Sequence, residues 1–352
     1  MNWHKLTTRI CILAILAAML LRYAGSGLSG DNGGFFSQPA LASFLIYSES
    51  GRKPTPTEPS STAGTQPSTT EATTPETEPP VSEPEPTIPE TVPQPSVPPV
   101  SYATFAAADT AYLGISYSCS YRPDTQKLLL QKLTWDLTGD KPTILIIHSH
   151  GTEAYTQTAD SRYEGHAAYR TTDTQYNMIS IGDELTRLLQ ENGLNVLHDR
   201  TAHDYLDYDN AYQKSRAAVQ AYLKEYPSIK LVLDLHRDAI TNADGTQYAP
   251  TTIINGQSSA QLMFVVGTDA SGDKHSKWQT NLSIAEKLHV LSEKNADGLC
   301  RPINLRSKAY NQDLSVGSLL VEVGAAGNTH AEAINAMTPL ATAILQLVHG
   351  TT

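Results

Sequence analysis

The sequence contains polar residues that could together bind a metal ion and use it in catalysis. Two histidines follow one apolar run, a third histidine ends another, and a glutamate lies inside a further apolar run. With a second glutamate close by, the residues are His148, His150, Glu153, His236 and Glu322. Catalytic zinc sites take three protein ligands, often histidine and carboxylate, and keep one position open. A further glutamate can serve as the general base. These residue types therefore suggest a metal-dependent hydrolase.

The apolar runs beside these residues are typical of buried strands in a parallel sheet. They cover residues 144–147, 229–235 and 318–323. Ligands of open α/β sheets bind beyond the carboxyl ends of the strands, so we expect the polar residues to meet at one edge. His148 and His150 would share one strand face, because side chains alternate with a period of two.

Other interpretations of the same residues remain open. The histidines could be hydrogen-bonded residues of a sheet edge, and Glu322 could form a salt bridge with Arg237 or Arg306. Asp234 would support the sheet edge or orient a ligand. Ser149 stands in a pattern close to the serine nucleophile elbow G-x-S-x-G, but isoleucine replaces the first glycine and would crowd the tight turn. Serine catalysis is therefore the less favoured interpretation.

Helical and strand patterns alternate along the second part of the chain. Helices are expected at 126–133, 177–192, 211–226, 280–295 and 331–348, the last kinked at Pro339, and strands at 144–147, 194–197, 230–235, 251–255, 262–267 and 319–323. This alternation predicts an α/β fold with a mostly parallel sheet flanked by helices on both faces.

The chain divides into four segments by composition. Residues 1–26 carry a short apolar run after basic residues, which favours a membrane anchor over a cleaved signal segment. Residues 27–53 would be membrane-proximal. Residues 54–100 are rich in Pro, Thr, Ser and Glu without Lys or Arg, which predicts a disordered, extended linker. Residues 101–352 are long enough to form one catalytic domain.

The acidity of the chain comes mainly from the linker. The net charge is −11, and the seven glutamates of residues 54–100 leave −4 for the rest. The overall charge therefore says little about the substrate. The sequence contains no glycine-rich phosphate loop and no basic patch, which argues against nucleic acid as a partner. Three cysteines do not make a disulfide framework, although Cys119 and Cys300 could pair.

Four motifs resemble the stage II sporulation protein P family. They are His148-Ser-His150-Gly-Thr-Glu153-Ala-Tyr155, Tyr176-Asn-Met-Ile-Ser-Ile-Gly182, Leu233-Asp-Leu-His236-Arg-Asp238 and Leu320-Val-Glu322-Val-Gly324. The layout of anchor, linker and terminal domain is also similar. The resemblance covers residues 102–348, and the motifs are specific only in combination.

The resemblance implies a fold similar to zinc-dependent N-acetylmuramoyl-L-alanine amidases. It implies that the chain binds Zn²⁺ and cleaves peptidoglycan at the amide between glycan and stem peptide, and also at D,D-peptide cross-links. Members act outside the cytoplasm at the cell membrane, during engulfment of the forespore, with stage II sporulation proteins D and M as partners. The main alternative is a non-enzymatic scaffold that binds peptidoglycan and acts through partner proteins.

The same resemblance implies roles for individual residues. His150, Glu153 and His236 would bind zinc, Glu322 would be the catalytic acid and base, and His148 would be a supporting residue or the alternative ligand. One feature departs from the amidases, whose glutamate ligand lies near the start of the first helix. This chain has Gln175 and Asn177 there, so Glu153 is the nearest candidate. Three residues are expected to contact substrate, namely Arg162, Arg237 and Tyr310.

Overall fold

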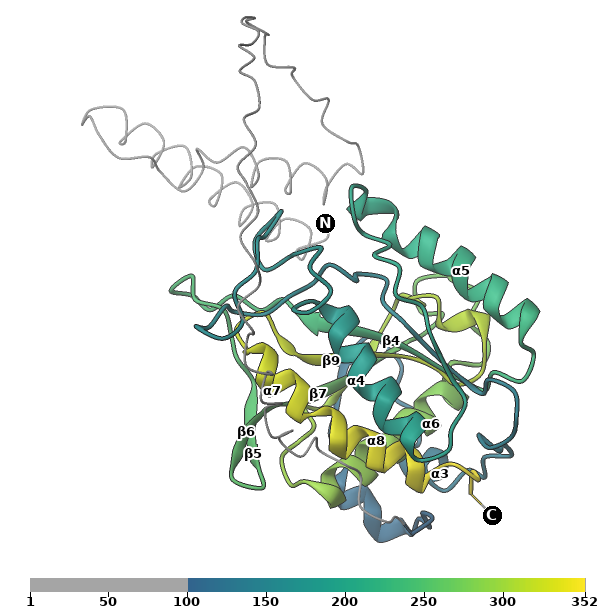
Figure 1. Cartoon of the computed structure of the whole chain (residues 1–352). Coiled ribbons are helices and arrows are strands. Elements are labelled where there is room, and N and C mark those ends of the chain that lie inside the picture. Colours follow the sequence, from purple (N-terminus) through teal and green to yellow (C-terminus); the bar gives the residue numbers. More distant parts are fainter. Residues whose placement is uncertain (1–100, 352) are drawn as a thin grey trace, which may run out of the picture. The chain divides into compact units, whose positions relative to one another are not determined.

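A seven-stranded sheet forms the centre of the computed structural model, which describes residues 101–351 (Figure 1). The predictions for residues 1–26, 27–53 and 54–100 lie outside this range. The strands are β1 (Ile115–Ser118), β2 (Ile144–Ile147), β3 (Val196–His198), β4 (Leu231–Asp238), β7 (Leu262–Gly267), β8 (Ile303–Arg306) and β9 (Ser318–Ala325). Their order across the sheet is β1-β8-β7-β9-β4-β2-β3.

The sheet consists of two parallel groups that run in opposite directions. Every neighbouring pair is parallel except β7 and β9, which are antiparallel. The strands β2, β4 and β9 are buried along most of their length and are rich in branched apolar residues, as expected for strands covered on both faces. The predicted mostly parallel α/β fold is therefore confirmed.

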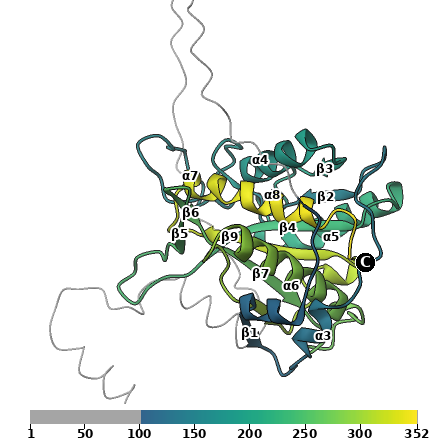
Figure 2. The ribbon, with the colours of Figure 1, turned by 90° about the horizontal axis from the view of Figure 1, so that it is seen from below.

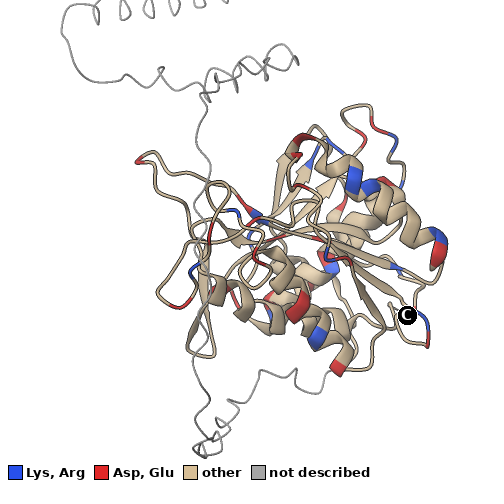
Figure 3. Cartoon of the chain, turned by 45° about the horizontal axis from the view of Figure 1, so that its top comes forward, with Lys and Arg blue, Asp and Glu red and all other residues tan. Residues whose placement is uncertain are grey.

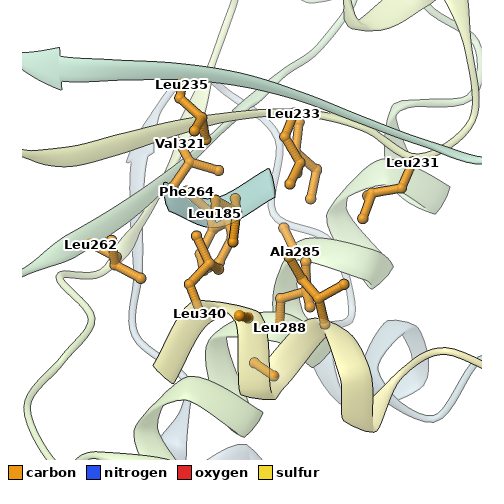
Figure 4. Packing of buried hydrophobic residues seen from close by; sticks show 14 of the residues in the cluster. Leu185, Leu231, Leu233, Leu235, Leu262, Phe264, Ala285, Leu288, Val321 and Leu340 are labelled. Atoms are coloured by element: carbon orange, nitrogen blue, oxygen red, sulfur yellow. The ribbon is translucent and has the colours of Figure 1, made fainter. Parts of the chain in front are cut away.

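Most helices cover one face of the sheet. The helices of the described range are α3 (Thr125–Leu129), α4 (Met178–Glu191), α5 (Ala211–Glu225), α6 (Trp278–Asn295), α7 (His330–Asn335) and α8 (Met337–Gln346). Figure 4 shows Leu185 of α4, Leu288 of α6 and Leu340 of α8 packed together against β-strand residues such as Leu233 and Val321. This cluster is the main hydrophobic core.

The other face of the sheet is covered by α5 (Figures 1 and 2). Val219 of α5 packs against Leu145, Ile147 and Val232 in a second, smaller cluster. Successive side chains of a strand point to opposite faces. In β4, Leu231, Leu233 and Leu235 therefore join the main core, whereas Val232, Asp234 and His236 face the side of α5. The functional residues of β4 thus lie on the thinly covered face.

Several elements differ from the sequence-based expectations. Strands β1 and β8 at one end of the sheet were not expected, because they are short and only partly apolar. The pair β5 (Thr251–Ile254) and β6 (Gln257–Ala260) forms a separate antiparallel hairpin. The closing helix is two helices divided at Ala336, whereas Pro339 lies in the first turn of α8, where proline is tolerated.

The surface of the described part carries both signs of charge (Figure 3). Acidic and basic side chains are interspersed on the helices. Cys119 and Cys300 are both free thiols. Within residues 101–351, no helix combines the length and the apolar character that a membrane crossing requires.

Candidate metal centre and active site

Strands β4 and β9 place His236 and Glu322 side by side on the face of α5. The two residues are direct neighbours in the register of this parallel pair, and Met263 of β7 is the neighbour of Glu322 on its other side. Both polar residues lie inside their strands rather than beyond the strand ends. The expected convergence therefore takes place on a sheet face near the carboxyl ends of β4 and β9.

The segment after β2 brings His150 and Glu153 to the same place. The imidazole rings of His150 and His236 lie edge to face, with centroids 5.3 Å apart. Glu153 Oε2 lies 3.6 Å from His236 Nδ1 and accepts a hydrogen bond from the backbone N–H of Arg237 at 3.2 Å. The backbone of Ala154 pairs with Asn177 at the start of α4. Glu153 therefore lies next to the helix start in space, although it is distant in sequence.

Glu153 is held as a carboxylate by its surroundings. Burial alone would raise its pKa, but Arg237, His236 and His150 together lower the pKa of Glu153 to about 2. Arg237 Nη1 lies 3.6 Å from Glu153 Oε1, and Arg170 Nη2 lies 3.9 Å from the same oxygen. A buried anion of this kind matches what a metal ligand must be.

Asp234 connects His236 to the segment after β2. Its carboxylate accepts hydrogen bonds from the Ser149 backbone N–H at 2.8 Å and from Ser149 Oγ at 2.6 Å. Asp234 Oδ1 also lies 2.9 Å from His236 Nε2. Burial disfavours a charged His236, but Asp234 and Glu153 outweigh this and raise the pKa of His236 well above its usual value.

Glu322 has a carboxylate oxygen without a partner. Oε2 is buried and forms no hydrogen bond, although the residue as a whole is partly exposed. Burial raises the pKa of Glu322 to about 8. Within the described range it forms no ion pair with Arg237 or Arg306, since Arg237 contacts Glu153 and Arg306 is exposed. Glu322 is thus a carboxyl group that can exchange a proton near neutral pH.

His148 belongs to a separate buried network. Its Nδ1 contacts the Leu235 carbonyl at 3.1 Å, and its Nε2 contacts His198 Nε2 at 2.8 Å. His198 in turn contacts Asp183 at 3.0 Å. Burial lowers the pKa of His148 to about 3. Both ring nitrogens of His148 are therefore occupied by protein contacts, whereas Nδ1 of His150 has no hydrogen-bond partner.

Ser149 does not contact a histidine through its hydroxyl group. Oγ donates to Asp234 and shares a second hydrogen bond of 2.7 Å with Ser215 Oγ. A serine nucleophile needs a general base within hydrogen-bond reach. The contacts of Ser149 instead anchor Asp234.

Two tyrosines around His150, Tyr208 and Tyr212, were not expected from the sequence. The Tyr208 ring stacks on His150 with centroids 4.4 Å apart, and the Arg170 guanidinium lies 4.0 Å from the centroid of the Tyr208 ring. The Tyr212 ring stacks on His236 at 6.2 Å and meets His150 edge-on at 5.4 Å. These residues come from segments distant in sequence, so no local pattern marks them.

The expected substrate contacts lie in different surroundings. Arg162 is exposed on the loop between β2 and α4. Arg237 is buried, and its guanidinium donates to the carbonyls of Ala154 and Tyr169, both at 3.0 Å. Tyr310 packs beside Met263 and Val265 on the face that carries Glu322. Of the three, Tyr310 is the residue that lines a pocket next to the candidate site.

The residues fit a zinc ion by type and by one unsatisfied atom. Two histidines and one glutamate are a known ligand set of catalytic zinc. His150 Nδ1 is buried without a hydrogen-bond partner, and such atoms are rare unless a ligand or function accounts for them. His236 Nε2 lies 2.9 Å from Asp234 Oδ1. As the side chains stand, no group of three or more His, Cys, Asp or Glu residues in the range 101–351 is disposed as a metal site. The types of the donor residues thus fit zinc. In this structure, however, the His236 ring faces the carboxylates of Asp234 and Glu153.

Comparison with known proteins identifies relatives of this sequence. The family model of stage II sporulation protein P matches residues 46–345. Stage II sporulation protein P of Bacillus subtilis (strain 168) is 29% identical over 202 residues, which cover 54% of this chain and 47% of that protein. The match therefore spans about half of the length of the relative.

Solved structures of amidases are similar at a lower level. The CwlD amidase of Clostridioides difficile, in complex with the GerS lipoprotein, has a TM-score of 0.36 and 13% identity over 58% of this chain and 96% of its own. The N-acetylmuramoyl-L-alanine amidase AmiC2 of Nostoc punctiforme has a TM-score of 0.35 and 14% identity over 60% of this chain and 97% of its own.

These amidase similarities are too weak to carry an argument about function. The family model, in contrast, spans most of the chain and includes all four motifs around the candidate site. The chain therefore belongs to the stage II sporulation protein P family.

Proposed function

We propose that this chain is a zinc-dependent peptidoglycan hydrolase. It would cleave the amide between N-acetylmuramic acid and L-alanine, and also D,D-peptide cross-links, during engulfment of the forespore. The observation that carries the proposal is the meeting of His150, Glu153, His236 and Glu322 on one thinly covered sheet face. Membership of the family supports the same conclusion.

His150, Glu153 and His236 would hold the zinc ion. When bound, zinc supplies a Lewis acid that polarises the scissile carbonyl and lowers the pKa of a water molecule. Glu153 contributes the negative charge, because its pKa of about 2 keeps it ionised. The backbone N–H of Arg237 donates to Glu153 and orients it. Asp234 faces His236, and the hydrogen bond from Ser149 holds Asp234 in place.

Glu322 would move the proton of the reaction. Its free Oε2 and its pKa of about 8 suit a group that takes a proton from the attacking water and then gives it to the departing amine. Met263 of β7 and Leu320 of β9 form an apolar surface next to Glu322 on the same face of the sheet. Tyr208 and Tyr212 stack on the rings of His150 and His236, respectively.

The first experiment is the substitution Glu322→Gln in the purified chain. Release of stem peptides from peptidoglycan should fall by about 10²–10⁴-fold, the usual contribution of a general acid or base. Zinc content should be unchanged. Glu225→Gln, at the exposed end of α5, is the matched control and should keep full activity. Loss of zinc together with activity would make Glu322 a ligand and contradict the assignment.

The second experiment removes the metal. The purified chain should contain about one zinc ion, and chelation should abolish stem-peptide release until zinc is added back. Tight binding to peptidoglycan without release or zinc would favour the scaffold alternative. Release that survives chelation would argue for a metal-independent reaction, and labelling of Ser149 by a serine-reactive probe would then identify the nucleophile.

The biological setting is part of the same proposal. The chain would act at the cell membrane, held by residues 1–26, with stage II sporulation proteins D and M as partners. Mass spectrometry of the products from cross-linked and uncross-linked peptidoglycan would separate the amidase and D,D-endopeptidase activities. Cell fractionation with and without residues 1–26 would test the anchor, and co-purification from sporulating cells would test the partners.

A further inference from the structure

A pocket of about 480 Å³ lies next to the candidate active site. Its walls come from α5, from the loop before α6 and from the segment between β8 and β9. The residues that matter for its chemistry are Tyr212, Arg216, Asp273, Lys274, Lys308 and Tyr310. None of the roles proposed above for zinc binding or proton transfer uses this pocket.

A single tyrosine separates the pocket from the proposed metal ligands. Tyr212 lines the pocket, and its ring also stacks on His236 with centroids 6.2 Å apart. The Tyr310 ring lies beside it in the pocket wall and contacts it edge-on, with centroids 5.9 Å apart. Tyr310 packs on Met263, the neighbour of Glu322 across the sheet. The pocket therefore lies on the other side of the Tyr212 ring from His236, within reach of a substrate that extends past this ring.

The pocket wall is held in an unusual backbone conformation. Tyr310 and Asn311 are consecutive left-handed residues, with φ of 50° and 60°. Such conformations are unfavourable outside glycine, and they persist where the surroundings enforce them, often at functional sites. Asn311 Nδ2 donates to the Tyr212 carbonyl at 2.8 Å and to Ser215 Oγ at 3.2 Å. The wall is therefore fixed to α5 rather than loosely placed.

The charges of the pocket are not balanced. Arg216 forms two hydrogen bonds with Asp313, at 2.8 and 2.6 Å. Asp273 accepts hydrogen bonds from Ser271 Oγ and from the Ala309 backbone N–H, both at 3.0 Å. Lys274 and Lys308 are exposed, and neither forms an ion pair within the described range 101–351. Two ammonium groups are thus available to a negatively charged ligand.

We propose that this pocket binds the stem peptide of peptidoglycan by its free carboxylates, with Lys274 and Lys308 as specificity-determining residues. The inference rests on the proposed function, because it takes the substrate from it. Stem peptides carry a free carboxylate on the γ-linked D-glutamate and another on the diamino acid. Tyr212 and Tyr310, whose rings contact each other, would pack against one side of the peptide. Amidation of the D-glutamate removes one charge without a change of size, so the pocket should discriminate against amidated stems.

The test compares acidic and amidated ligands of equal length. Binding of the free tripeptide L-Ala-γ-D-Glu-diaminopimelate to the purified full chain is measured by calorimetry, beside its D-isoglutamine form. The tripeptide contains neither of the bonds that the enzyme is proposed to cleave. Wild type should prefer the acidic form. Lys274→Met and Lys308→Met should each weaken acidic binding by about threefold and together by about tenfold. The double variant should weaken binding of the amidated form less, because that form has one carboxylate fewer to lose.

Two controls separate charge from shape. Lys277→Met removes an exposed lysine three residues from Lys274 that does not line the pocket, and it should leave binding unchanged. Lys274→Arg and Lys308→Arg should restore acidic binding. In the hydrolysis of soluble glycan fragments, the double Met variant should show a raised KM and a kcat close to that of wild type.

The outcomes distinguish this inference from the proposed function. Stem-peptide release with equal affinity for acidic and amidated peptides, or with no effect of the double Met variant, would overturn the inference and leave the function standing. Charge-dependent binding without any hydrolysis would support the pocket and overturn the catalytic proposal. Absence of binding by both peptides would overturn the inference.

Discussion

Asp234 is the residue that links the two halves of the candidate metal site. Its carboxylate faces His236 from β4 and holds Ser149 of the segment that also carries His150. A residue in this position orients ligands without touching the metal. The partners of metal ligands commonly contribute 10–100-fold to metal affinity.

Asp234→Asn should therefore weaken zinc binding by about 10–100-fold. The amide keeps the size of the side chain but loses the charge that faces His236 and one of the two acceptor oxygens that Ser149 uses. Competition with a chromophoric chelator would measure the zinc affinity. Asp244→Asn, in an exposed loop, is the control. An unchanged zinc affinity in Asp234→Asn would remove Asp234 from the site.

Helix α4 packs on the sheet through a glycine. A Cβ atom at Gly182 would come within 2.5 Å of His198 Nε2 and 2.6 Å of His148 Nε2. These nitrogens are in contact with each other at 2.8 Å, directly beneath the helix. The crossing of α4 over the histidine pair therefore requires the smallest residue, which accounts for the glycine at the end of the motif Tyr176–Gly182.

Gly182→Ala should lower the free energy of unfolding by about 1–3 kcal/mol, as overpacked cores do. The loss is expected although alanine usually favours a helix by about 1 kcal/mol over glycine. Urea denaturation followed by circular dichroism measures the difference. The double variant Gly182→Ala/His198→Ala removes the obstructing ring and should recover part of the loss. Additive losses in the double variant would show that His198 is not the cause.

Helix α6 contains a buried carboxyl group that lacks partners. Glu286 is fully buried, and neither of its carboxylate oxygens forms a hydrogen bond. Burial raises the pKa of Glu286 to about 8. The neighbouring Lys287 instead donates to the Leu128 carbonyl at 3.0 Å and to Ser283 Oγ at 2.9 Å. Glu286 is therefore protonated in the folded chain at neutral pH.

The contribution of Glu286 to the stability of the fold should consequently fall as the pH rises from about 5 to about 8. In this window the unfolded chain has already released the Glu286 proton, while the folded chain still binds it. Glu286→Gln should remove this contribution and stabilise the chain relative to wild type at pH 8 by about 1–4 kcal/mol, with little effect at pH 5. Urea denaturation at both pH values measures it.

Glu225→Gln is the control, because it makes the same substitution at an exposed position of another helix, α5. It should leave the pH dependence of unfolding as it is in wild type. If Glu286→Gln kept the wild-type slope between pH 5 and 8, the proton of Glu286 would not be the source of the dependence.

At the scale of the whole molecule, the candidate metal site joins segments that are far apart in the chain. His150 and Glu153 follow β2, while His236 comes from β4 and Glu322 from β9. A ligand that binds the folded state and not the unfolded chain stabilises the fold by mass action. Metal binding at this place should therefore be visible in the thermal stability of the chain.

Zinc at about 100-fold above its Kd should raise the Tm by about 5–10 °C, from a stabilisation of about 3 kcal/mol. Differential scanning calorimetry with and without zinc measures the shift. His236→Ala should abolish it, since one of the three proposed ligands is missing. Removal of an exposed histidine by His166→Ala should leave it intact. A shift that persists in His236→Ala would place the zinc elsewhere.

The periodic and apolar parts of the chain could be predicted from its sequence. Residues 144–147 and 262–267 are strands within the expected bounds, and the helices α4 and α5 begin and end within a residue or two of expectation. Hydrophobic periodicity is a local property, so a window of sequence contains it. The family also follows from the chain alone, because its motifs are continuous in sequence.

The environment of each functional side chain was decided only by the tertiary structure. The sequence places His148 and His150 on one strand face, yet His148 is bound to Leu235 and His198 while His150 faces His236. The antiparallel pairing of β7 with β9 depends on hydrogen bonds between distant segments. The pairing of Arg237 with Glu153 likewise depends on which segments of the chain meet, and so does the position of Tyr212 between the candidate site and the pocket. A local pattern predicts which residues are buried. Whether a buried residue is a metal ligand, a support for a ligand or part of a pocket wall depends on its contacts with segments that are distant in the sequence.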